Sequence, residues 1–352
     1  MAINLADKYS AKVAERFAHK AYSAGIAGNA YDFDGVKSIK VYSIDTVPLG
    51  NYSRSGTSRY GTPTDLTDSY QTMVMTQDKA FTYIIDKGDG KEQLNIKKAN
   101  KALAREVDER INPYMDKYNF AAWVKGAGQY VSAASITANN ALGLVQDATE
   151  KLDEMACPDS GRTLVVTNNF FKLLKQNPNF VYTDKLAQDS MVRGKVGEID
   201  GMAIRKVPNN YFPSGVVAMV VHSSALLAPM KLKEYKIHTD PPGINGNLTE
   251  GRILHDAFVL DAKADAIVVI CTNAAVTNAL SVSVTSHVAT ISFTAATGDK
   301  VLYTVDGTDP RCSGTATAWS SGTITLTAGQ TIRVKAYDAS EAIGWKEATG
   351  NY

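Results

Sequence analysis

Residues 48–69 read PLGNYSRSGTSRYGTPTDLTDS, and this segment separates two strand-like runs. It holds almost no aliphatic side chains, two prolines and three glycines, so it cannot build a core of its own. Such a long structureless loop is unusual in a compact domain unless it is functional or disordered. Strand-like runs rich in Val, Ile and Tyr flank it at 36–47 and 70–86. The pattern predicts a long projecting arm whose two strands rise to and return from this tip.

The tip of the predicted arm carries the candidate contact residues Tyr52, Arg54, Arg59 and Tyr60. Tyrosine and arginine are enriched where protein surfaces meet, because they bury a large area and can form hydrogen bonds at the same time. We therefore expect these four side chains to contact another subunit. The alternative is a mobile, solvated loop without a partner.

Three amphipathic helices are predicted in the first half of the chain. Leu5, Tyr9, Val13 and Phe17 recur at four-residue spacing, which indicates a helix that packs on its own domain or docks on a neighbouring copy. Apolar residues at 94–118 predict a helix of about 40 Å, with a kink or a restart at Pro113. A further helix is expected at 138–155, with Thr137 or Asn139 as its N-cap.

The remainder up to Cys271 mixes strands with one short helix. The expected helix is capped by Asn168 or Asn169 and runs through Lys175. Strands are expected at 162–167, within 195–208 about the turn at 199–201, and at 216–221, 235–239 and 258–271. Because no regular βαβ repeat is present, the predicted fold class is α+β.

The last 80 residues differ in composition, with 14 threonines, 8 serines and few charges. Alternating runs predict a small β-sandwich, joined to the rest by a linker at 272–279; they lie at 281–285, 288–294, 301–305, 323–327 and 331–337. Asp306 and Asp309 invite a calcium or acid-pair interpretation. A tight turn fits better, since Asp hydrogen-bonds its own backbone and Gly307 tolerates a positive φ.

Composition and motif searches exclude several function classes. The chain has 352 residues, 44% of them hydrophobic, and a net charge of +1, so bulk charge attracts neither nucleic acid nor anionic membrane. No signal peptide or membrane span is expected. Cys157, Cys271 and Cys312 are expected to be buried thiols in a reducing compartment. The five histidines lie at least 16 positions apart, and neither a nucleotide-binding loop nor a GxSxG elbow is present. We predict no catalytic residues, no cofactor and no metal.

Many short segments, matched in order, carry a resemblance to the major capsid protein of tailed bacteriophages. None is a catalytic motif, and together they span residues 1–270. They are Met1 to Ala6, Val13 to Phe17, Val41 to Ile44, Asn51 to Arg54, Arg59 to Pro63, Phe81 to Gly88, Ala102 to Asp108 and Asp256 to Leu260.

The resemblance implies the capsid fold that tailed phages share with herpesviruses, in a shell domain at 1–271. Its expected parts are an N-terminal arm at 1–35, an extended β-hairpin loop at 36–86, a long spine helix at 91–128, an axial domain at 138–231 and returning peripheral strands at 235–270. The family's lysine–asparagine crosslink between subunits is not carried over, because nothing in this sequence identifies either partner.

The resemblance also implies function and partners. The chain is expected to form hexamers and pentamers of an icosahedral head shell that encloses double-stranded DNA without reading its sequence. A scaffolding protein and a portal are implied as further partners. The expected location is the virion capsid, assembled in the cytoplasm of a bacterial host.

Residues 280–352 resemble the immunoglobulin-like module at the C-terminus of chitobiase and β-hexosaminidase enzymes. Tyr303, Asp306, Gly307, Asp309 and Pro310 carry its signature. On a capsid this module would stand on the outer surface, where a surface glycan is an expected ligand. Two alternatives remain open at this point: an encapsulin-like bacterial compartment shell, and a secreted glycan-binding or glycan-degrading protein.

Overall fold

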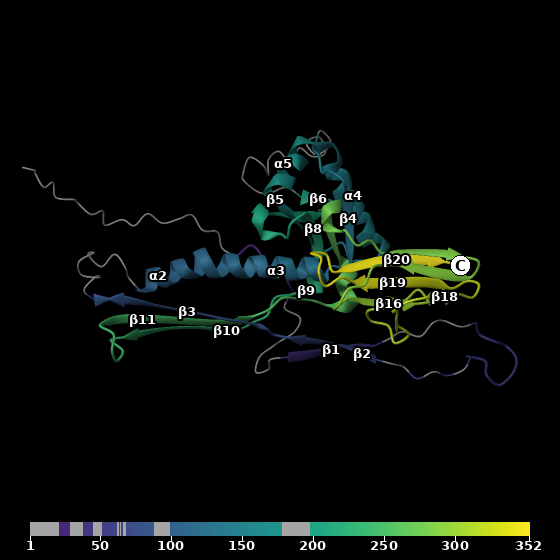
Figure 1. The fold of residues 1–352 in the computed structure, drawn as a ribbon, viewed down its shortest axis with the longest axis horizontal. Helices are drawn as coiled ribbons and strands as arrows, with labels where there is room; N and C mark the ends of the chain where they lie inside the picture. The colour runs from purple at the N-terminus through teal and green to yellow at the C-terminus, as the bar shows by residue number, and fades with distance from the viewer. Residues whose placement is uncertain are drawn as a thin grey trace, which may run out of the picture.

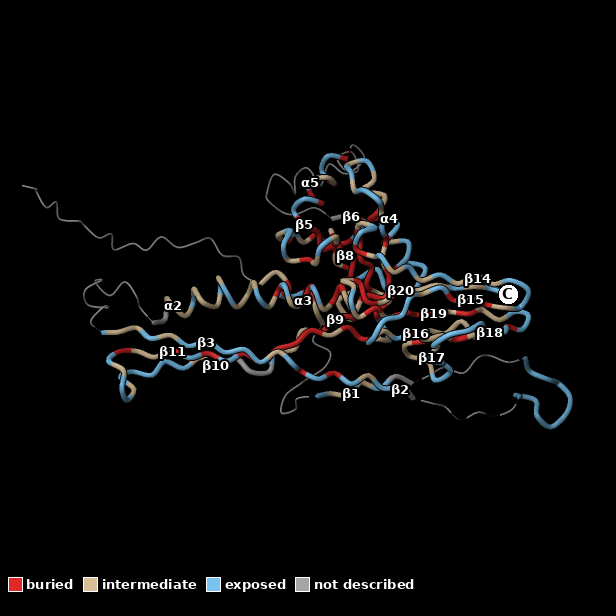
Figure 2. The backbone as a smooth tube through the Cα atoms, in the orientation of Figure 1, coloured by how far each residue is buried: buried red, intermediate tan, exposed pale blue. Residues whose placement is uncertain are grey.

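The structure, a computed structural model, describes residues 21–28, 38–44, 51–61, 63, 65, 68–87, 99–177 and 198–352. The helix expected at 5–17 lies outside these residues. Figure 1 shows an elongated α+β molecule with a central lobe. A helix and a long sheet extend to one side of the lobe, a β domain lies on the other, and a separate hairpin runs below. Figure 2 shows that buried residues concentrate in the lobe, whereas the projecting parts are largely exposed.

The predicted arm is a hairpin of β1 (Ser38–Ile44) and β2 (Asp68–Val74), which pair antiparallel over all seven residues of each strand. The run at 70–86 is not one strand, however. Residues 75–76 separate β2 from β3 (Gln77–Asp86), which pairs antiparallel with β11 (Gly246–His255) and not with β1. This connection is fixed by Asp256, whose carboxylate accepts hydrogen bonds from the Thr76 N–H at 2.7 Å and from the Thr76 hydroxyl at 3.0 Å.

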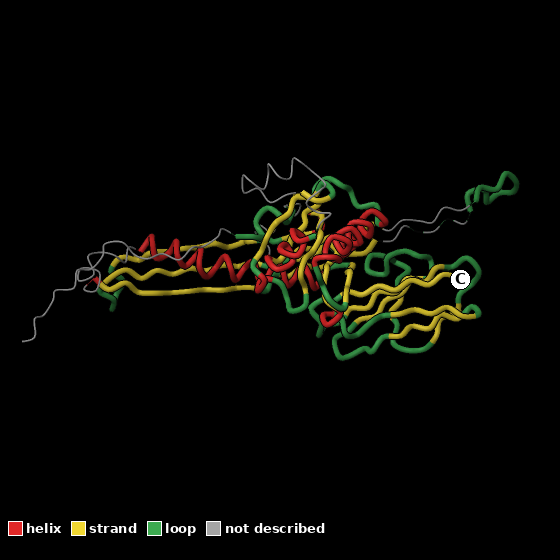
Figure 3. The backbone as a smooth tube through the Cα atoms, turned by 90° about the horizontal axis from the view of Figure 1, so that it is seen from above, coloured by secondary structure: helices red, strands yellow, loops and turns green. Residues whose placement is uncertain are grey.

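The long sheet has three strands in the order β10, β11 and β3, with β10 spanning Met230–Thr239. A helix runs alongside it, as Figures 1 and 3 both show. This helix comprises α2 (Ala99–Glu106), a π-helical turn η1 (Val107–Ile111) and α3 (Asn112–Gly126). The predicted restart at Pro113 is confirmed, since this proline stands in the first turn of α3 and lacks the amide that an interior position would use.

The central lobe is built on a six-stranded sheet in the order β4-β13-β8-β5-β7-β6. Only the pairs β4/β13 and β5/β7 are parallel. Alternate residues of the buried strands point to opposite faces, so each face has its own core. Phe120 and Trp123 of α3 cover one face, and α4 and α5 cover the other. The strands are β4 (Gln129–Ala133), β5 (Arg162–Thr167), β6 (Glu198–Ile199), β7 (Met202–Val207), β8 (Val216–His222) and β13 (Ile267–Thr272).

The two helices of the lobe, α4 and α5, allow the expected N-cap residues to be compared with the observed ones. Helix α4 (Ala138–Glu154) begins after Thr137, which forms a capping box with Asn140, so the expected cap at Thr137 is confirmed. Helix α5 (Asn168–Gln176) is capped by Thr167 and not by Asn168 or Asn169. The Thr167 hydroxyl accepts a hydrogen bond from the Phe170 N–H at 3.3 Å, while both asparagines already lie inside the helix. The last residue of a strand therefore serves as the cap.

The strand expected at 258–271 is interrupted. It consists of β12 (Phe258–Val259), which pairs with β9 (Leu226–Leu227), a 3-10 segment η4 (Asp261–Ala266), and then β13. Further 3-10 turns are η2 (Asn209–Tyr211), η3 (Ser223–Ala225) and η5 (Asn273–Ala275). The interruption matters because η4 carries Asp265, which faces the C-terminal residues.

Residues 281–351 form two sheets that share one apolar core, here called the C-terminal β domain. The five expected strands are present, and two more were not predicted: a two-residue strand, β17, and the final strand, β20, whose sequence WKEATGN lacks clear alternation. One sheet contains β14 (Ser281–Thr285), β15 (Val288–Ser292) and β18 (Thr323–Thr325). The other contains β17 (Thr317–Ala318), β16 (Lys300–Thr304), β19 (Thr331–Tyr337) and β20 (Trp345–Asn351).

Candidate interaction surfaces

The tip of the arm, residues 51–61, is exposed along its whole length. Tyr52 and Tyr60 contact each other edge to face, with ring centroids 5.1 Å apart, and the ring of Tyr60 is 92% exposed. Arg59 closes the turn, because its Nε donates to the Gly56 carbonyl at 3.2 Å and its own carbonyl accepts from the Ser53 N–H at 2.9 Å. Figure 3 shows the described tip well away from the C-terminal β domain. The structure thus brings the two predicted tyrosines together on a local turn, beside an exposed Arg54.

The hairpin below the tip has two different faces. Its inner face packs Met73 and Met75 against Leu227 and Leu260 of the lobe. Its outer face exposes aromatic side chains: Tyr42 is 62% exposed and Tyr70 is 58% exposed. The centroids of these two rings lie 5.9 Å apart, and the Lys40 ammonium lies 4.4 Å from the centroid of the Tyr70 ring. Sequence reasoning missed this outer face, although strict alternation along the strand could have indicated it.

Gln71 fixes the base of the arm through two hydrogen bonds that pass to the lobe. Its amide donates to the Val259 carbonyl at 2.8 Å, and its carbonyl oxygen accepts from the Asp261 N–H at 3.0 Å. The hairpin is therefore anchored at one end and exposed at the other.

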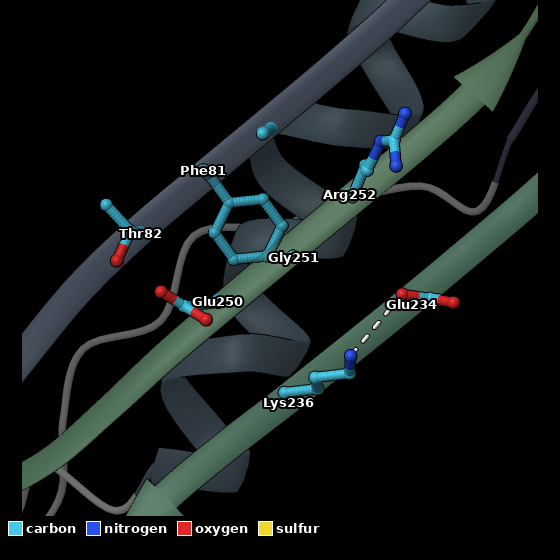
Figure 4. A pocket seen from close by; sticks show the side chains of 8 residues that line it. Phe81, Thr82, Glu234, Lys236, Glu250, Gly251 and Arg252 are labelled. Atoms are coloured by element: carbon cyan, nitrogen blue, oxygen red, sulfur yellow. Dashed lines mark ion pairs between the residues drawn. The ribbon is translucent and has the colours of Figure 1, made fainter. Parts of the chain in front are cut away.

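The face of the long sheet drawn in Figure 4 carries a shallow groove with paired charges. Arg252 forms a bidentate pair with Asp78 at 2.7 and 3.0 Å, which raises the pKa of this arginine. Two acidic and two basic side chains line the groove, namely Glu234, Glu250, Lys236 and Arg252. The groove has no net charge, so it offers no electrostatic attraction to an anion.

The signature of the C-terminal β domain forms a turn after β16. Asp306 accepts hydrogen bonds from the N–H and the hydroxyl of Thr308, at 3.1 and 2.6 Å, as a turn-forming aspartate does. Gly307 has a φ of +77°, which favours glycine. Tyr303 is half-buried in β16 and Pro310 is buried.

Asp309 also forms a turn as predicted, because its Oδ1 accepts a hydrogen bond from the Arg311 N–H at 2.9 Å. It has a second role, which sequence reasoning missed. It pairs with Arg311 at 2.6 Å, and the same Arg311 nitrogen reaches Asp265 of the lobe, also at 2.6 Å. The side chain of Arg311 is only 1% exposed. The turn therefore holds a buried cation that joins the two parts of the chain.

Six charges gather at this contact and form what we call the junction cluster: Asp265, Asp309, Arg311, Arg333, Lys335 and Glu347. Three are acidic and three are basic, so their formal charges cancel. Asp265 also accepts from Arg333 at 2.9 Å and from Lys335 at 2.8 Å. Lys335 is fully buried and donates to Glu347 as well, at 2.6 Å. Since a buried ion is stable only when paired, each member of the cluster depends on the others.

The electrostatics of the cluster follow from burial and from opposite charge. Burial alone would raise the pKa of Asp265, but Arg311 and Lys335 outweigh it and hold this pKa well below the ordinary value. For Arg311, burial would lower the pKa, and Asp265 together with Asp309 raises it instead. Gly128 makes room for this arrangement, because a Cβ there would lie 2.2 Å from a carboxylate oxygen of Asp265. The carboxylate of Asp265 is therefore ionised at neutral pH.

The segment expected to be a linker at 272–279 is also held by hydrogen bonds. Residue 272 ends β13, and 273–275 form η5. Glu341 then accepts from the N–H and the hydroxyl of Thr277, at 2.7 and 2.6 Å, and from the Asn278 N–H at 2.8 Å. Its other oxygen pairs at 2.7 Å with the fully buried Lys346. Lys125 of α3 adds a bond to the Ala339 carbonyl at 2.8 Å.

Metal ligands, membrane-spanning helices and reactive thiols are the other features that bear on function. The described residues contain no group of three or more His, Cys, Asp or Glu side chains that could hold a metal ion. Across the same described ranges, no helix is long and apolar enough to span a bilayer. The cysteines are free, but only Cys271 is buried, whereas Cys157 and Cys312 are half-exposed because they lie in turns. Burial raises the pKa of Cys271 to about 12, so its thiol is protonated and unreactive.

Comparison with known proteins shows a likeness in structure only. No protein-family model matches the chain, and no curated protein sequence matches it either. A chain of Mycobacterium phage Che8 superposes with a TM-score of 0.63 at 16% identity, over 76% of this chain and 98% of that one.

Two capsid structures give similar values. A chain from the capsid of the cyanophage P-SCSP1u has a TM-score of 0.62 at 13% identity, over 76% of this chain and 93% of that one. A chain from the mature capsid of bacteriophage PhiM1 has a TM-score of 0.62 at 11% identity, over 76% and 92%. Most of this chain therefore has the fold seen in these phage capsids.

Proposed function

We propose that this chain is the major capsid protein of a tailed bacteriophage, which assembles with copies of itself into an icosahedral shell around double-stranded DNA. The fold shared with phage capsid chains supports this proposal over 76% of the sequence. The observation that carries it in this molecule is the arm, which is anchored at its base and presents Tyr42, Tyr70 and the tip to solvent.

An exposed arm can gain free energy when a neighbouring copy of the chain covers it. Contacts between two different patches of identical chains can close into rings and then into a shell. Each square ångström of apolar surface covered by a neighbour contributes about 25 cal/mol. Ordering a loop costs about 1 to 2 kcal/mol per residue in backbone entropy. Only extensive contact with a neighbouring copy offsets that cost, and we assign this contact to Tyr52, Arg54, Arg59 and Tyr60.

The share of the chain outside the structural likeness supports a separate role for the C-terminal β domain. The likeness covers 76% of 352 residues, or about 268, which is close in size to the part that precedes residue 272. We propose that the remaining immunoglobulin-like domain is displayed on the outer surface of the shell and that a surface glycan is its ligand. A scaffolding protein and a portal complete the proposed set of partners, in a virion assembled in the host cytoplasm.

Charge reversal at the tip tests the proposal. Electron microscopy of the purified wild-type chain should show shells, rings or hexamers. The double variant Arg54→Glu with Arg59→Glu should keep the wild-type circular dichroism spectrum and lose the particles. As a control with the same change in charge, Lys263→Glu with Lys300→Glu alters two exposed lysines outside the arm and should still assemble. A strictly monomeric wild-type chain would refute the proposal, and normal particles from the arm variant would remove these arginines from the contact.

A further inference from the structure

His255 is the last residue of β11, at the point where the long sheet, helix α3 and residues 75–76 meet. It is only 1% exposed. The rings of Tyr114 and Tyr118 pack edge-on against its imidazole, with centroids 5.7 and 5.4 Å away. Within the described residues neither ring nitrogen of His255 has a hydrogen-bond partner. A doubly unpartnered buried imidazole is costly, since its N–H group finds no acceptor.

The surroundings of the ring favour its neutral form. An imidazolium would bury a charge and two N–H donors without an acceptor, and burial accordingly is the main cause that lowers the pKa of His255. Asp256 opposes this by attracting a positive charge, while Lys79 of β3 adds to it. The adjacent phenol of Tyr118 stays neutral, because burial and Asp256 raise its pKa to about 12. Tyr114 donates its hydroxyl hydrogen to Gln77 at 3.1 Å and not to the imidazole.

The carboxylate of Asp256, next to His255, connects three segments of the chain. Asp256 accepts hydrogen bonds from the N–H and hydroxyl of Thr76, which lies between β2 and β3. It also accepts hydrogen bonds from the Tyr118 hydroxyl at 2.7 Å and from the Ala257 N–H at 2.8 Å. It therefore ties the chain leaving the arm to helix α3 and to the end of the long sheet. Because Tyr118 contacts both the carboxylate and the imidazole, movement of His255 acts directly on this tie.

We propose that His255 is an acid-sensitive switch: when its ring takes up a proton from solvent, it leaves the space between the two tyrosines and opens the Asp256 tie. Residues 75–76 are then released from helix α3, while the two Gln71 hydrogen bonds still hold the arm to the lobe. This device goes beyond the proposed assembly, since it acts within a single chain.

The direction of the pH effect follows from proton linkage. In the open state the ring is solvated and titrates near its ordinary value of about 6.5, whereas in the closed state its pKa is lower. Between the two values the open state binds more protons, so the closed state loses stability as pH falls. The opening equilibrium should rise by up to about 10-fold per pH unit within that window. Above both values the switch has no effect.

Hydrogen exchange of the full chain between pH 7.5 and 5.0 tests the switch. The probes are the amides of Thr76 and Ala257, which donate to Asp256, with exchange rates corrected for the intrinsic effect of pH. Wild-type protection should fall by up to about 10-fold per unit below pH 6.5. In His255→Phe, which keeps an aromatic ring between the tyrosines and cannot titrate, protection should stay flat.

A control and a second measurement keep the test decisive. His238→Gln removes an exposed histidine that pairs with Glu250 on the same sheet, and it should behave as wild type does. Nuclear magnetic resonance of the histidine rings in the wild-type chain does not depend on any variant folding. Titration of His255 at or above 6.5, or an equal loss of protection in wild type and His255→Phe, would overturn the proposal.

Discussion

The arm and the C-terminal β domain both project from the central lobe, yet they are attached in opposite ways (Figures 1 and 2). The arm is anchored by Gln71 and a few apolar side chains at its base, whereas its tip is exposed and packs Tyr52 against Tyr60. The β domain is attached through six charges in which Arg311 and Lys335 are almost inaccessible to solvent. The two projecting elements therefore differ. Among the described residues the arm has an exposed outer face and an exposed tip, whereas the β domain is held in a fixed position by its contacts within its own chain.

Charge, and not apolar area, gives that fixed position its specificity. Apolar contacts tolerate small rotations, but a buried carboxylate that receives three cations has one satisfactory geometry. Asp265 therefore acts as the reference point for the orientation of the β domain.

The largest effect is expected from Asp265→Asn. The change keeps the size of the side chain and removes the charge that faces Arg311, Lys335 and Arg333. Removing one partner of a buried ion pair costs about 3 to 5 kcal/mol, because the remaining charges stay buried without compensation. Calorimetry should show the β domain unfolding in a separate, earlier transition. The control Asp78→Asn breaks an exposed pair with Arg252 and should leave the unfolding transition close to that of the wild-type chain, because solvent screens exposed ion pairs.

Acid should weaken the same junction in the wild-type chain. The pKa of Asp265 is depressed in the folded protein, so its stabilising contribution is complete above the ordinary value of about 3.9 and is lost as pH falls below it. Urea unfolding measured from pH 6 to pH 3 should show this loss. In Asp265→Asn the slope with pH should be shallower, and identical slopes for the two proteins would assign the acid sensitivity to other carboxylates.

A smaller effect is expected from Glu341→Gln, at the start of the β domain. The amide can still accept from Thr277 and Asn278, but it no longer compensates the buried charge of Lys346. Leaving a buried polar group poorly paired costs about 1 to 3 kcal/mol. Cleavage within 272–279 in a limited proteolysis experiment should become faster. Unchanged cleavage would show that this segment is held by η5 and β14 alone.

Much of the fold could be predicted from local sequence patterns, because caps, turns and alternating strands depend on residues that are close together in the sequence. The Thr137 cap, the restart at Pro113 and the turn at 199–201 each depend on neighbouring residues only. The alternating runs after residue 280 predicted five strands of the β domain for the same reason. The apolar-poor segment at 48–69 predicted the hairpin that flanks it.

The junction could not be predicted, because its members are distant in sequence. Asp265 lies in a segment expected to be a continuous strand, and Arg333, Lys335 and Glu347 look like ordinary solvent-facing charges of a sheet. No pattern in the neighbouring sequence indicates that the lobe covers the face of the sheet that these three residues share. The same limit applied to Asp309, for which a turn role was sufficient explanation until Arg311 was seen to reach the lobe.

The smallest effect on folding is expected at the tip of the arm, and it makes the contrast sharpest. Tyr60→Ser changes a residue that is 92% exposed and whose ring packs against Tyr52. The free energy of unfolding of the isolated chain should change by no more than about 0.5 kcal/mol, as for other surface substitutions. If the tip contacts a neighbouring copy, the same variant should still lower the yield of particles in electron microscopy. Loss of stability without loss of particles would reverse the argument, since the tip would then support its own chain and not its neighbour.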